Sequence, residues 1–388
     1  MTSPVVPDDM WLAAERTTAS ALTEQAAPVG FWAGVRGRLF RHRPAMAGLI
    51  FIILLILVAV FGPMASRYSY FEQNLELSNL PPLYRPYTVS DGTKVYVNTS
   101  NLSLYGIGPD GGIDTFLRPD KKDMLKRQSL WDIDGHAIAL DYAQRPPVLL
   151  VDGKQAMAGG LSVNRRNYFG TDQLGRDVLV RQLYGARISL LVAAAAVLTN
   201  FVIGVAFGGV AGLMGGRVDA LMMRFVEVVA TIPLTLYVIL MMVVLQSGLL
   251  SVVLAIGTVY WVDMARIVRG QILTLKGQDF VAAARTMGAS TGRILLRHLL
   301  PNAFGPILVT LTMLIPSAIF IESFMSFIGL GVTPPQASWG TLTSEAVETL
   351  RAYPYQLFFP AVAISLTMLA FNFLGDGLRD ALDPRLSS

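Results

Sequence analysis

Residues 46–65, MAGLIFIILLILVAVFGPMA, contain no charged side chain. A helix of about 20 apolar residues matches the ~30 Å hydrocarbon core of a bilayer, so this stretch predicts a transmembrane helix. The composition agrees, because 53% of the 388 residues are hydrophobic and 15% are charged, with a mean hydropathy of +0.50. Such values are typical of an integral membrane protein rather than of a soluble domain.

Further apolar stretches predict an all-α polytopic protein with six transmembrane helices in total. The other five are residues 188–212, 225–246, 249–265, 303–328 and 356–375. Arginines between residues 36 and 43, with no acidic residue among them, predict that segment 1–45 is cytoplasmic. Six crossings also place the basic loop 266–302 and the tail 376–388 in the cytoplasm. We therefore expect a multi-pass protein of a bacterial plasma (inner) membrane, in contact with lipid and with both termini cytoplasmic.

The long segment 66–187 lies between the first two predicted helices. Its charges do not prevent an outside location, because long loops cross a membrane largely regardless of charge. Within it, GTKVYVNTSNLSLYGIG alternates apolar and polar residues, and PPVLLVDGK is a short apolar run before a turn. These patterns predict a small β-rich extracytoplasmic insert. Its role as a docking surface or as a spacer stays open.

Several kinds of chemistry lack their residues in this sequence. There is no cysteine, and His42, His136 and His298 are far apart, with no HExxH helix. We therefore expect no metal site and no catalytic residue. No G-x-x-x-x-G-K-[ST] phosphate loop occurs, so the chain is not expected to bind ATP or another cofactor. The basic residues do not form one tract, which argues against nucleic acid as a partner.

The segment 279–302, DFVAAARTMGASTGRILLRHLLPN, is alanine-rich and basic, and it belongs to the predicted cytoplasmic loop. Helical spacing gives it one apolar stripe made of Phe280, Ala283, Ala284, Met287, Ile294 and Leu295. Gly288 permits a tight turn, and the pair Pro301 and Asn302 is expected to break the helix before the next span. Small side chains let another protein approach closely. A helix that lies on the membrane surface is the alternative.

Two other features suggest sites. In FGTDQLGRD, the residues Asp172, Arg176 and Asp177 predict a charge-paired turn at the outer face, before the second span. We interpret it as a structural cap, with contact to an outside protein as the alternative. Glu322 is an acid within an apolar run, and such residues commonly mark a transport pathway. It could instead lie at the outer interface.

The segment 279–302 also resembles the cytoplasmic coupling loop of permease subunits of ATP-binding-cassette (ABC) importers. The pattern of that loop is E-A-A, three residues, G, nine residues, I-x-L-P. The matching positions here are Ala283, Ala284, Gly288, Leu300 and Pro301. Ala282 stands where the pattern has glutamate, and His298 stands where it has isoleucine. The residues that the resemblance assigns to ATPase coupling are Ala282, Ala283, Ala284, Arg285, Gly288, Leu300, Pro301 and Asn302.

Other stretches are similar to the oligopeptide and dipeptide branch of these permeases, and most like its second, C-type subunit. They are FGTDQLGRDVLVRQLYGARISLL, GGRVDALMMRFVEVVATIP, WVDMARIVRGQ, ESFMSFIGLGVTPPQASWG and GDGLRDALDPRL. The resemblance implies a type I ABC importer permease fold with a five-helix permease core at 188–375. It implies half of a pathway for oligopeptides, with a second homologous permease and an extracytoplasmic peptide-binding protein as partners. Two ATPase subunits would bind ATP and magnesium, and this chain would catalyse nothing.

Alternative functions stay open at this point. The same branch includes importers of dipeptides, nickel and other peptide-like solutes. A secondary transporter would be expected to show inverted repeats or several buried ionisable residues, and only Glu322 stands out, with Asp263 and Asn372 near span ends. A membrane-embedded enzyme would need a convergent catalytic cluster, and the spans offer none.

Overall fold

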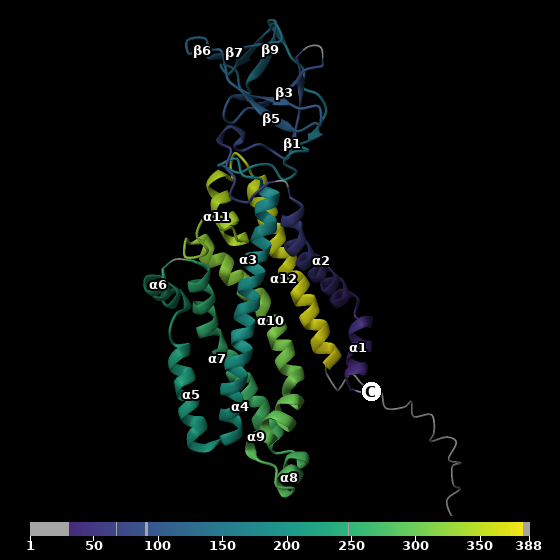
Figure 1. Ribbon diagram of the computed structural model, residues 1–388, viewed down its shortest axis with the longest axis vertical. Helices are drawn as coiled ribbons and strands as arrows, with labels where there is room; N and C mark the ends of the chain where they lie inside the picture. The colour runs from purple at the N-terminus through teal and green to yellow at the C-terminus, as the bar shows by residue number, and fades with distance from the viewer. Residues whose placement is uncertain (1–30, 67, 90–91, 247, 383–388) are drawn as a thin grey trace, which may run out of the picture.

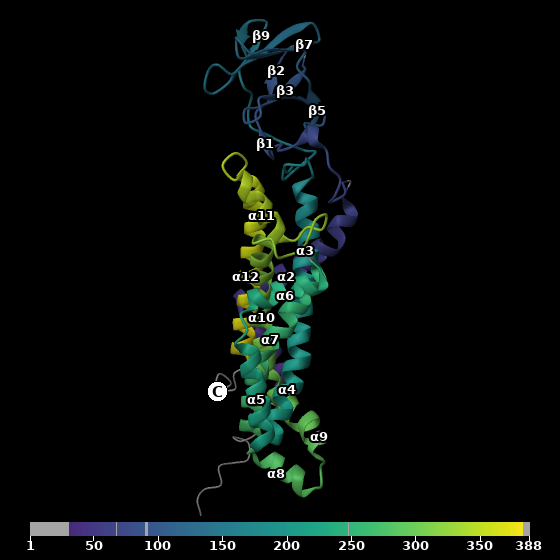
Figure 2. The same ribbon diagram turned by 90° about the vertical axis from the view of Figure 1, so that its left-hand side faces the viewer.

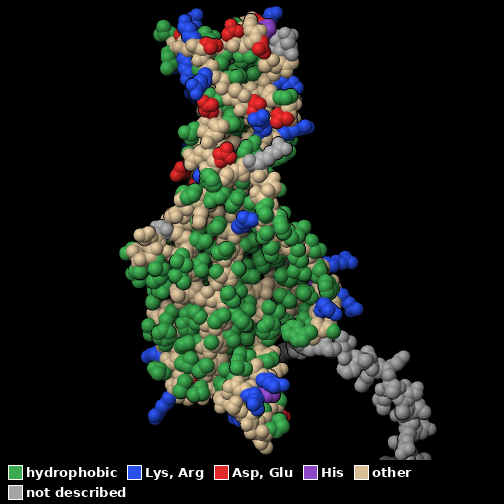
Figure 3. Space-filling model, viewed as in Figure 1, with side chains coloured by type: hydrophobic (Ala, Val, Ile, Leu, Met, Phe, Trp, Pro, Cys, Tyr) green, Lys and Arg blue, Asp and Glu red, His purple; other side chains and the backbone are tan. Residues whose placement is uncertain are grey.

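The computed structural model describes residues 31–66, 68–89, 92–246 and 248–382. A bundle of long helices carries a β-rich insert at one end, here called the insert end (Figure 1). The opposite end, where α8 lies, is called the far end. Hydrophobic side chains cover most of the flank of the bundle, whereas charged side chains gather mostly on the insert and toward the far end (Figure 3). This distribution is that of a protein whose bundle is surrounded by lipid.

The predicted all-α membrane bundle with a β-rich insert is confirmed. The helices are α1 (Phe31–Arg41), α2 (Arg43–Ala65), α3 (Val178–Thr199), α4 (Val205–Met214), α5 (Gly216–Ala230), α6 (Leu234–Leu245), α7 (Leu249–Lys276), α8 (Asp279–Thr286), α9 (Thr291–Ile294), α10 (Leu300–Phe327), α11 (Trp339–Thr349) and α12 (Tyr355–Leu382). Five helical stretches among the described residues are long and apolar enough to cross a membrane: α2, α3 with α4, α7, α9 with α10, and α12. A sixth crossing requires the pair α5 and α6.

Two boundaries differ from the sequence-based expectation. Helix α3 begins at Val178, ten residues before the start predicted at 188, so the insert is shorter than 66–187. Helix α12 continues to Leu382, beyond the core end predicted at 375. Residues 1–30 of the predicted N-terminal segment and 383–388 of the predicted C-terminal tail lie outside the described residues.

The third predicted span, 225–246, is not one straight helix. Helices α5 and α6 meet at an angle of 81° across a break of three residues. Pro233 lies at this break. Because proline has no N–H to continue the helical hydrogen bonds, it interrupts the helix there. The flanking residues are apolar on both sides, so hydropathy alone did not reveal the bend. In Figure 1, α5 runs along the bundle and α6 lies across its flank.

Close helix contacts hold the bundle together. Gly208 and Gly212 lie on α4, and Gly204 lies in the π-helical turn just before it. A Cβ atom added to Gly204, Gly208 or Gly212 would lie 2.6, 2.3 or 2.9 Å, respectively, from the nearest atom of α7. Glycine therefore lets the backbones of these helices approach closely. Between α5 and α7, Arg269 donates two hydrogen bonds to Asp219, at 2.5 and 2.7 Å.

Helix α2 is tied to α3 by a basic side chain. Pro63 lies inside α2 and has no N–H to pair with the carbonyl of Ala59, four residues earlier. Arg187 of α3 supplies the missing donor, with Nε 2.7 Å from the Ala59 oxygen and an Nη 2.5 Å from the Val60 oxygen. The guanidinium thus satisfies backbone acceptors near the insert end of α2.

The predicted β-rich insert consists of antiparallel strands. They are β1 (Leu83–Tyr84), β2 (Tyr87–Thr88), β3 (Lys94–Asn98), β4 (Ser103–Ile107), β5 (Ile113–Leu117), β6 (Lys121–Asp123), β7 (Gln128–Ile133), β8 (His136–Asp141), β9 (Val148–Val151), β10 (Lys154–Gln155) and β11 (Ser162–Val163). One sheet has the order β2-β3-β4-β5, a second has β10-β9-β8-β7-β6, and β1 pairs with β11. Buried side chains of the first two sheets, among them Val95, Leu104, Trp131 and Leu140, share one core.

Polar contacts fix the base of the insert on the bundle. The Thr171 hydroxyl accepts a hydrogen bond from the Leu80 N–H at 2.8 Å. The Thr171 carbonyl accepts from the Tyr355 hydroxyl at 2.7 Å and from Gln356 Nε2 at 3.0 Å. Gln356 Nε2 also lies 2.9 Å from Asn79 Oδ1. The start of α12 therefore holds both ends of the insert.

Candidate functional site

The first candidate site is the segment 279–302 at the far end. Helices α8 and α9 lie there, and α8 projects beyond the ends of the long helices (Figures 1 and 2). Helix α7 leads into this segment and α10 leads out of it, so both of its ends are joined to long helices. The sequence places this segment and the insert on opposite sides of the membrane, and the structure places them at opposite ends of the bundle.

One side of the segment packs on the bundle. Val281, Ala284 and Ile294 are 0%, 2% and 3% exposed, in one apolar cluster with Met264 and Ile272 of α7. These contacts anchor the segment on α7 and on the start of α10. The geometry of the segment is therefore set by the long helices that carry it.

The other side faces outward and is partly apolar. Phe280, Met287 and Leu296 are 39%, 80% and 69% exposed, and Ala283 is exposed as well. The predicted single stripe is therefore wrong: Ala284 and Ile294 face the bundle, whereas Phe280, Ala283 and Met287 face away from it. The physical reason is that Val281 and Ala284, three residues apart, form the face of α8 that packs on the bundle, so Phe280 and Ala283 of the same helix turn outward. Among the remaining predicted coupling residues, Ala282, Arg285, Gly288, Pro301 and Asn302 are exposed and Leu300 is half-buried.

Gly288 makes the predicted tight turn. Its φ of 79° lies in the left-handed region that favours glycine. The Gly288 N–H donates to the Arg285 carbonyl at 2.9 Å, and the Ala289 N–H donates to the Ala284 carbonyl at 3.0 Å. This pair of bonds is the Schellman arrangement, which satisfies the last carbonyls of a helix. A Cβ atom on Gly288 would meet nothing within 4 Å, so the space outside the turn is open.

The predicted helix break at Pro301 and Asn302 is wrong. The chain stays helical from Thr291 to Phe327, through a π-helical turn at Leu295–Leu299. Proline is tolerated in the first turn of α10, where its missing N–H costs little, and the π turn changes the hydrogen-bond pattern just before it. Asn302 Nδ2 donates to the carbonyl of His298 at 2.6 Å. The segment is therefore continuous with α10.

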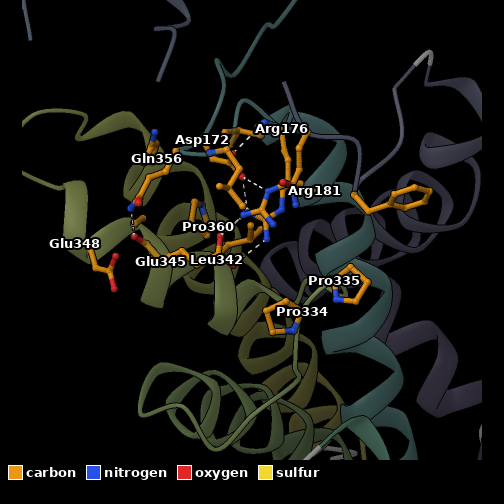
Figure 4. Close-up of a pocket in the computed structure, with 16 residues that line it drawn as sticks. Asp172, Arg176, Arg181, Pro334, Pro335, Leu342, Glu345, Glu348, Gln356 and Pro360 are labelled. Carbon is orange, nitrogen blue, oxygen red and sulfur yellow. Dashed lines mark hydrogen bonds and ion pairs between the residues drawn. The ribbon is translucent and has the colours of Figure 1, made fainter. Parts of the chain in front are cut away.

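The second candidate site is a charge cluster at the insert end (Figure 4). The predicted pairing in the turn is confirmed, because Arg176 Nε lies 2.7 Å from Asp172 Oδ2. Arg181 Nη1 lies 2.6 Å from Asp172 Oδ2 and 2.6 Å from Glu345 Oε2. An Nη of Arg176 also lies 2.9 Å from Glu345 Oε2. Two cations and two anions thus join the start of α3 to α11.

The sequence did not point to Arg181 or Glu345. Arg181 is 1% exposed and lies in the segment predicted as the insert, whereas Glu345 lies between the last two predicted spans. They are 164 residues apart, and helical periodicity carries no information on such a contact. The cluster borders a cavity of ≈ 470 Å³ whose lining includes Gln356 and Pro334. The predicted role of this turn as a cap or as a contact stays open.

Asp177 caps α3. Its Oδ1 accepts a hydrogen bond from the Val180 N–H at 2.8 Å, and its Oδ2 accepts one from Asn167 Nδ2 at 2.8 Å. Burial raises the pKa of this carboxyl above its usual value, although these hydrogen bonds act in the opposite direction. Asp177 is therefore the N-cap residue of α3.

Glu322 lies inside the protein. Its side chain is 0% exposed, and its two oxygens accept hydrogen bonds from the hydroxyls of Ser189 and Ser326, both at 2.9 Å. The Ser189 hydroxyl oxygen in turn accepts from the Trp339 N–H at 3.2 Å. Glu322 therefore links α10 to α3 and to the start of α11. Its role in a pathway stays a prediction.

Among the described residues, no group of three or more His, Asp or Glu side chains is arranged to hold a metal ion. Comparison with known proteins gives the context for these sites. The chain is 37% identical over 381 residues to the oligopeptide transport system permease protein OppC of Bacillus subtilis, a match that covers 98% of both proteins. This chain belongs to the oligopeptide/dipeptide permease family. It is therefore a permease subunit of an ABC importer and a multi-pass membrane protein.

Two family models match parts of this permease. The binding-protein-dependent transport system inner membrane component matches residues 204–388, which include the segment 279–302 and Glu322. The N-terminal TM domain of oligopeptide transport permease C matches residues 30–82. Residues 83–203, with the strands of the insert and the charged turn, lie between the two matches.

Two further relatives show what varies. The dipeptide transport system permease protein DppC of Bacillus subtilis is also 37% identical, over 382 residues, with 98% of this chain and 94% of the relative covered. Escherichia coli (strain K12) OppC is 46% identical over 229 residues, which is 59% of this chain and 76% of that protein. A match of that length cannot include both the whole insert and the helices α3 to α12. Because the OppC and DppC proteins of Bacillus subtilis are equally similar to this chain, the comparisons do not separate oligopeptides from dipeptides.

Proposed function

We propose that this permease forms half of the translocation pathway of an ABC importer for oligopeptides, and that separate ATPase subunits drive it through the segment 279–302. The observation that carries this proposal is the form of that segment. Its inner side, with Val281, Ala284 and Ile294, is anchored on α7 and α10. Its outer side offers Phe280 and Met287 at the end of the bundle away from the insert. A push on the outer side would therefore move two spans together.

The other partners follow from the same proposal. Two ATPase subunits bind ATP and magnesium, and a second homologous permease supplies the other half of the pathway. A peptide-binding protein delivers the cargo at the insert end, which faces the outside of a bacterial plasma membrane. Both termini are then cytoplasmic. Support comes from α1, which packs by Val35 against Ala381 and Leu382 at the end of α12.

The oligopeptide assignment has one direct competitor. Two relatives with equal identity carry the words oligopeptide and dipeptide in their names. The purified importer is reconstituted in proteoliposomes, and its uptake of dipeptides is compared with its uptake of peptides that have four or five residues. Preference for the longer peptides supports our proposal, and uptake of dipeptides alone contradicts it.

ATPase coupling is tested by substitution of a glycine. Gly288→Trp places a large side chain in the open space outside the turn, where the ATPase is proposed to bind. Gly135→Trp is the matched control, because Gly135 also has a positive φ, of 80°, and no atom within 4 Å of an added Cβ. Gly135 lies in the insert, between β7 and β8. Both substitutions strain the backbone by about 1–2 kcal/mol.

The expected result is that ATPase subunits copurify with wild-type protein and with Gly135→Trp, and are lost from Gly288→Trp. Wild-type protein and Gly135→Trp should also show ATP hydrolysis that is stimulated by peptide and binding protein, and Gly288→Trp should not. Retention of the ATPases by Gly288→Trp would contradict the assigned coupling surface. A chain that purifies without ATPases and transports along an ion gradient would instead support a secondary transporter.

A further inference from the structure

The turn between β6 and β7 in the insert has a well-defined shape. Asp123 Oδ1 accepts hydrogen bonds from the N–H groups of Leu125 and Lys126, both at 3.0 Å. The Arg127 carbonyl accepts from the Tyr142 N–H at 3.0 Å. These bonds fix the backbone of the turn, so its side chains project in defined directions.

The side chains of this turn are unusual for a surface facing only water. Leu125 is 98% exposed and Met124 is 79% exposed. Burial of such a side chain in a partner would be favourable because it removes apolar surface from water. The cations that flank them are Lys121, Lys122, Lys126 and Arg127. None of the four forms a salt bridge to another described residue, and Asp123 is the only acid within 121–127.

The turn lies away from the membrane. Figure 1 shows β6 and β7 at the end of the insert most distant from the helices, and Figure 3 shows Lys and Arg side chains along that part of the flank. A lipid surface is therefore an unsuitable partner. An anionic polymer would be bound by the cations alone and would leave Met124 and Leu125 exposed. Two exposed apolar side chains with four exposed cations next to them in the sequence fit a protein that has an apolar pocket and acidic residues near it.

The turn is also held in place relative to the spans. The base of the insert is hydrogen-bonded to α12 through Thr171, Tyr355 and Gln356. The charge cluster joins the adjacent start of α3 to α11. A protein bound to the turn would thus be held over the insert end of the bundle. Neither matching family model covers 83–163, whereas the matches to the two Bacillus subtilis relatives extend over 98% of this chain and so include the insert.

We propose that residues 121–127 dock the peptide-binding protein of this importer, with Leu125 and Met124 in an apolar pocket and the four cations against acidic residues around it. This inference rests on the function proposed above. It gives the insert a specific role, namely recruitment of one binding protein to this permease. Charge attraction accelerates the encounter, and the apolar pair supplies most of the affinity.

The test uses the complete importer in lipid nanodiscs with its own binding protein loaded with peptide. The rate of ATP hydrolysis is measured against the concentration of binding protein. The test variants are Leu125→Asp and the pair Lys121→Glu with Lys122→Glu. The controls are Met157→Asp, at an apolar side chain that is 89% exposed elsewhere in the insert, and Lys154→Glu, on β10 at the other edge of the same sheet.

We expect both test variants to raise the KM for the binding protein by about tenfold or more, with kcat unchanged, as for loss of a central contact residue. The controls should stay within about twofold of wild type, as expected for substitutions outside the contact. Added salt should raise the wild-type KM and should have less effect on the lysine variant.

An unchanged KM in both test variants would overturn the docking surface and leave the importer function intact. If both controls raise the KM as much as the test variants do, the docking surface is also overturned. Absence of any stimulation of the wild-type complex by loaded binding protein would contradict the proposed function itself. The two failures are therefore distinguishable.

Discussion

The contact between α4 and α7 makes a quantitative prediction, because a single methyl group is enough to disturb it. A Cβ atom on Gly208 would lie 2.3 Å from the carbonyl oxygen of Ala265, and α7 leads directly into the segment 279–302. Ordinary contacts between such atoms need about 3.5 Å, so one helix must move by about 1 Å. Gly270, also on α7, is the matched control, since an added Cβ there meets nothing within 4 Å.

The two variants Gly208→Ala and Gly270→Ala should differ in sign. Each replaces glycine by alanine inside a helix, which stabilises by about 0.5–1 kcal/mol. Only Gly208→Ala adds the cost of overpacking, about 1–3 kcal/mol. The difference between the two variants isolates that cost. For a helical core of about 200 residues, it corresponds to a difference in Tm of roughly 2–12 °C.

The assay heats each purified variant in mild detergent and measures by size-exclusion chromatography the fraction that stays monodisperse. We expect Gly208→Ala to unfold below wild type and Gly270→Ala at or above it. Equal Tm values for the two variants, or a higher value for Gly208→Ala, would refute the reasoning, because α4 and α7 would then have room for a methyl group.

Three further substitutions test local features, by the same thermal assay unless stated. Arg187→Ala should lower the Tm, since the Ala59 carbonyl, whose helical donor is missing at Pro63, loses its replacement donor at about 1–3 kcal/mol, and Arg187→Lys should lower it less; equal values for both variants would contradict this. Asp177→Ala should lose about 1 kcal/mol of helix capping. Asp177→Asn keeps the acceptor for the Val180 N–H and loses the acceptor for Asn167 Nδ2, so it should lower the Tm less than Asp177→Ala does; a loss equal to that of the alanine variant would contradict the cap. If Glu322 belongs to the pathway, Glu322→Gln should reduce peptide uptake in proteoliposomes without a lower Tm, and unchanged uptake would exclude that role.

The membrane helices and the insert could be predicted from sequence because each depends on a local pattern. The charge-free run at 46–65 leaves no alternative to a span, and α2 covers it. Strands β3 and β4 follow the alternation seen in GTKVYVNTSNLSLYGIG, and β9 follows PPVLLVDGK. Hydropathy reports how apolar a stretch is and not whether its helix is straight, however. The sequence-based prediction therefore did not include the 81° bend between α5 and α6, although Pro233 lies at it.

The candidate sites were predictable only where they depend on neighbours in the sequence. The turn at Gly288 and the pair Asp172 and Arg176 follow from local chemistry. The contacts of Arg181 with Glu345, and of Arg187 with the backbone near Pro63, join distant segments. No periodicity encodes such contacts, because they depend on how the helices pack.

The most direct test of the central claim uses the fact that the chain contains no cysteine. Met287→Cys places one thiol on the outer side of the segment 279–302, at a side chain that is 80% exposed. Met124→Cys is the control in the insert, at a side chain that is 79% exposed. A short bifunctional crosslinker, applied to membranes that contain the importer, should join Met287→Cys to an ATPase subunit and should not join Met124→Cys to one. No ATPase adduct at Met287→Cys, or an equal yield at Met124→Cys, would contradict the claim that the ATPases bind this segment.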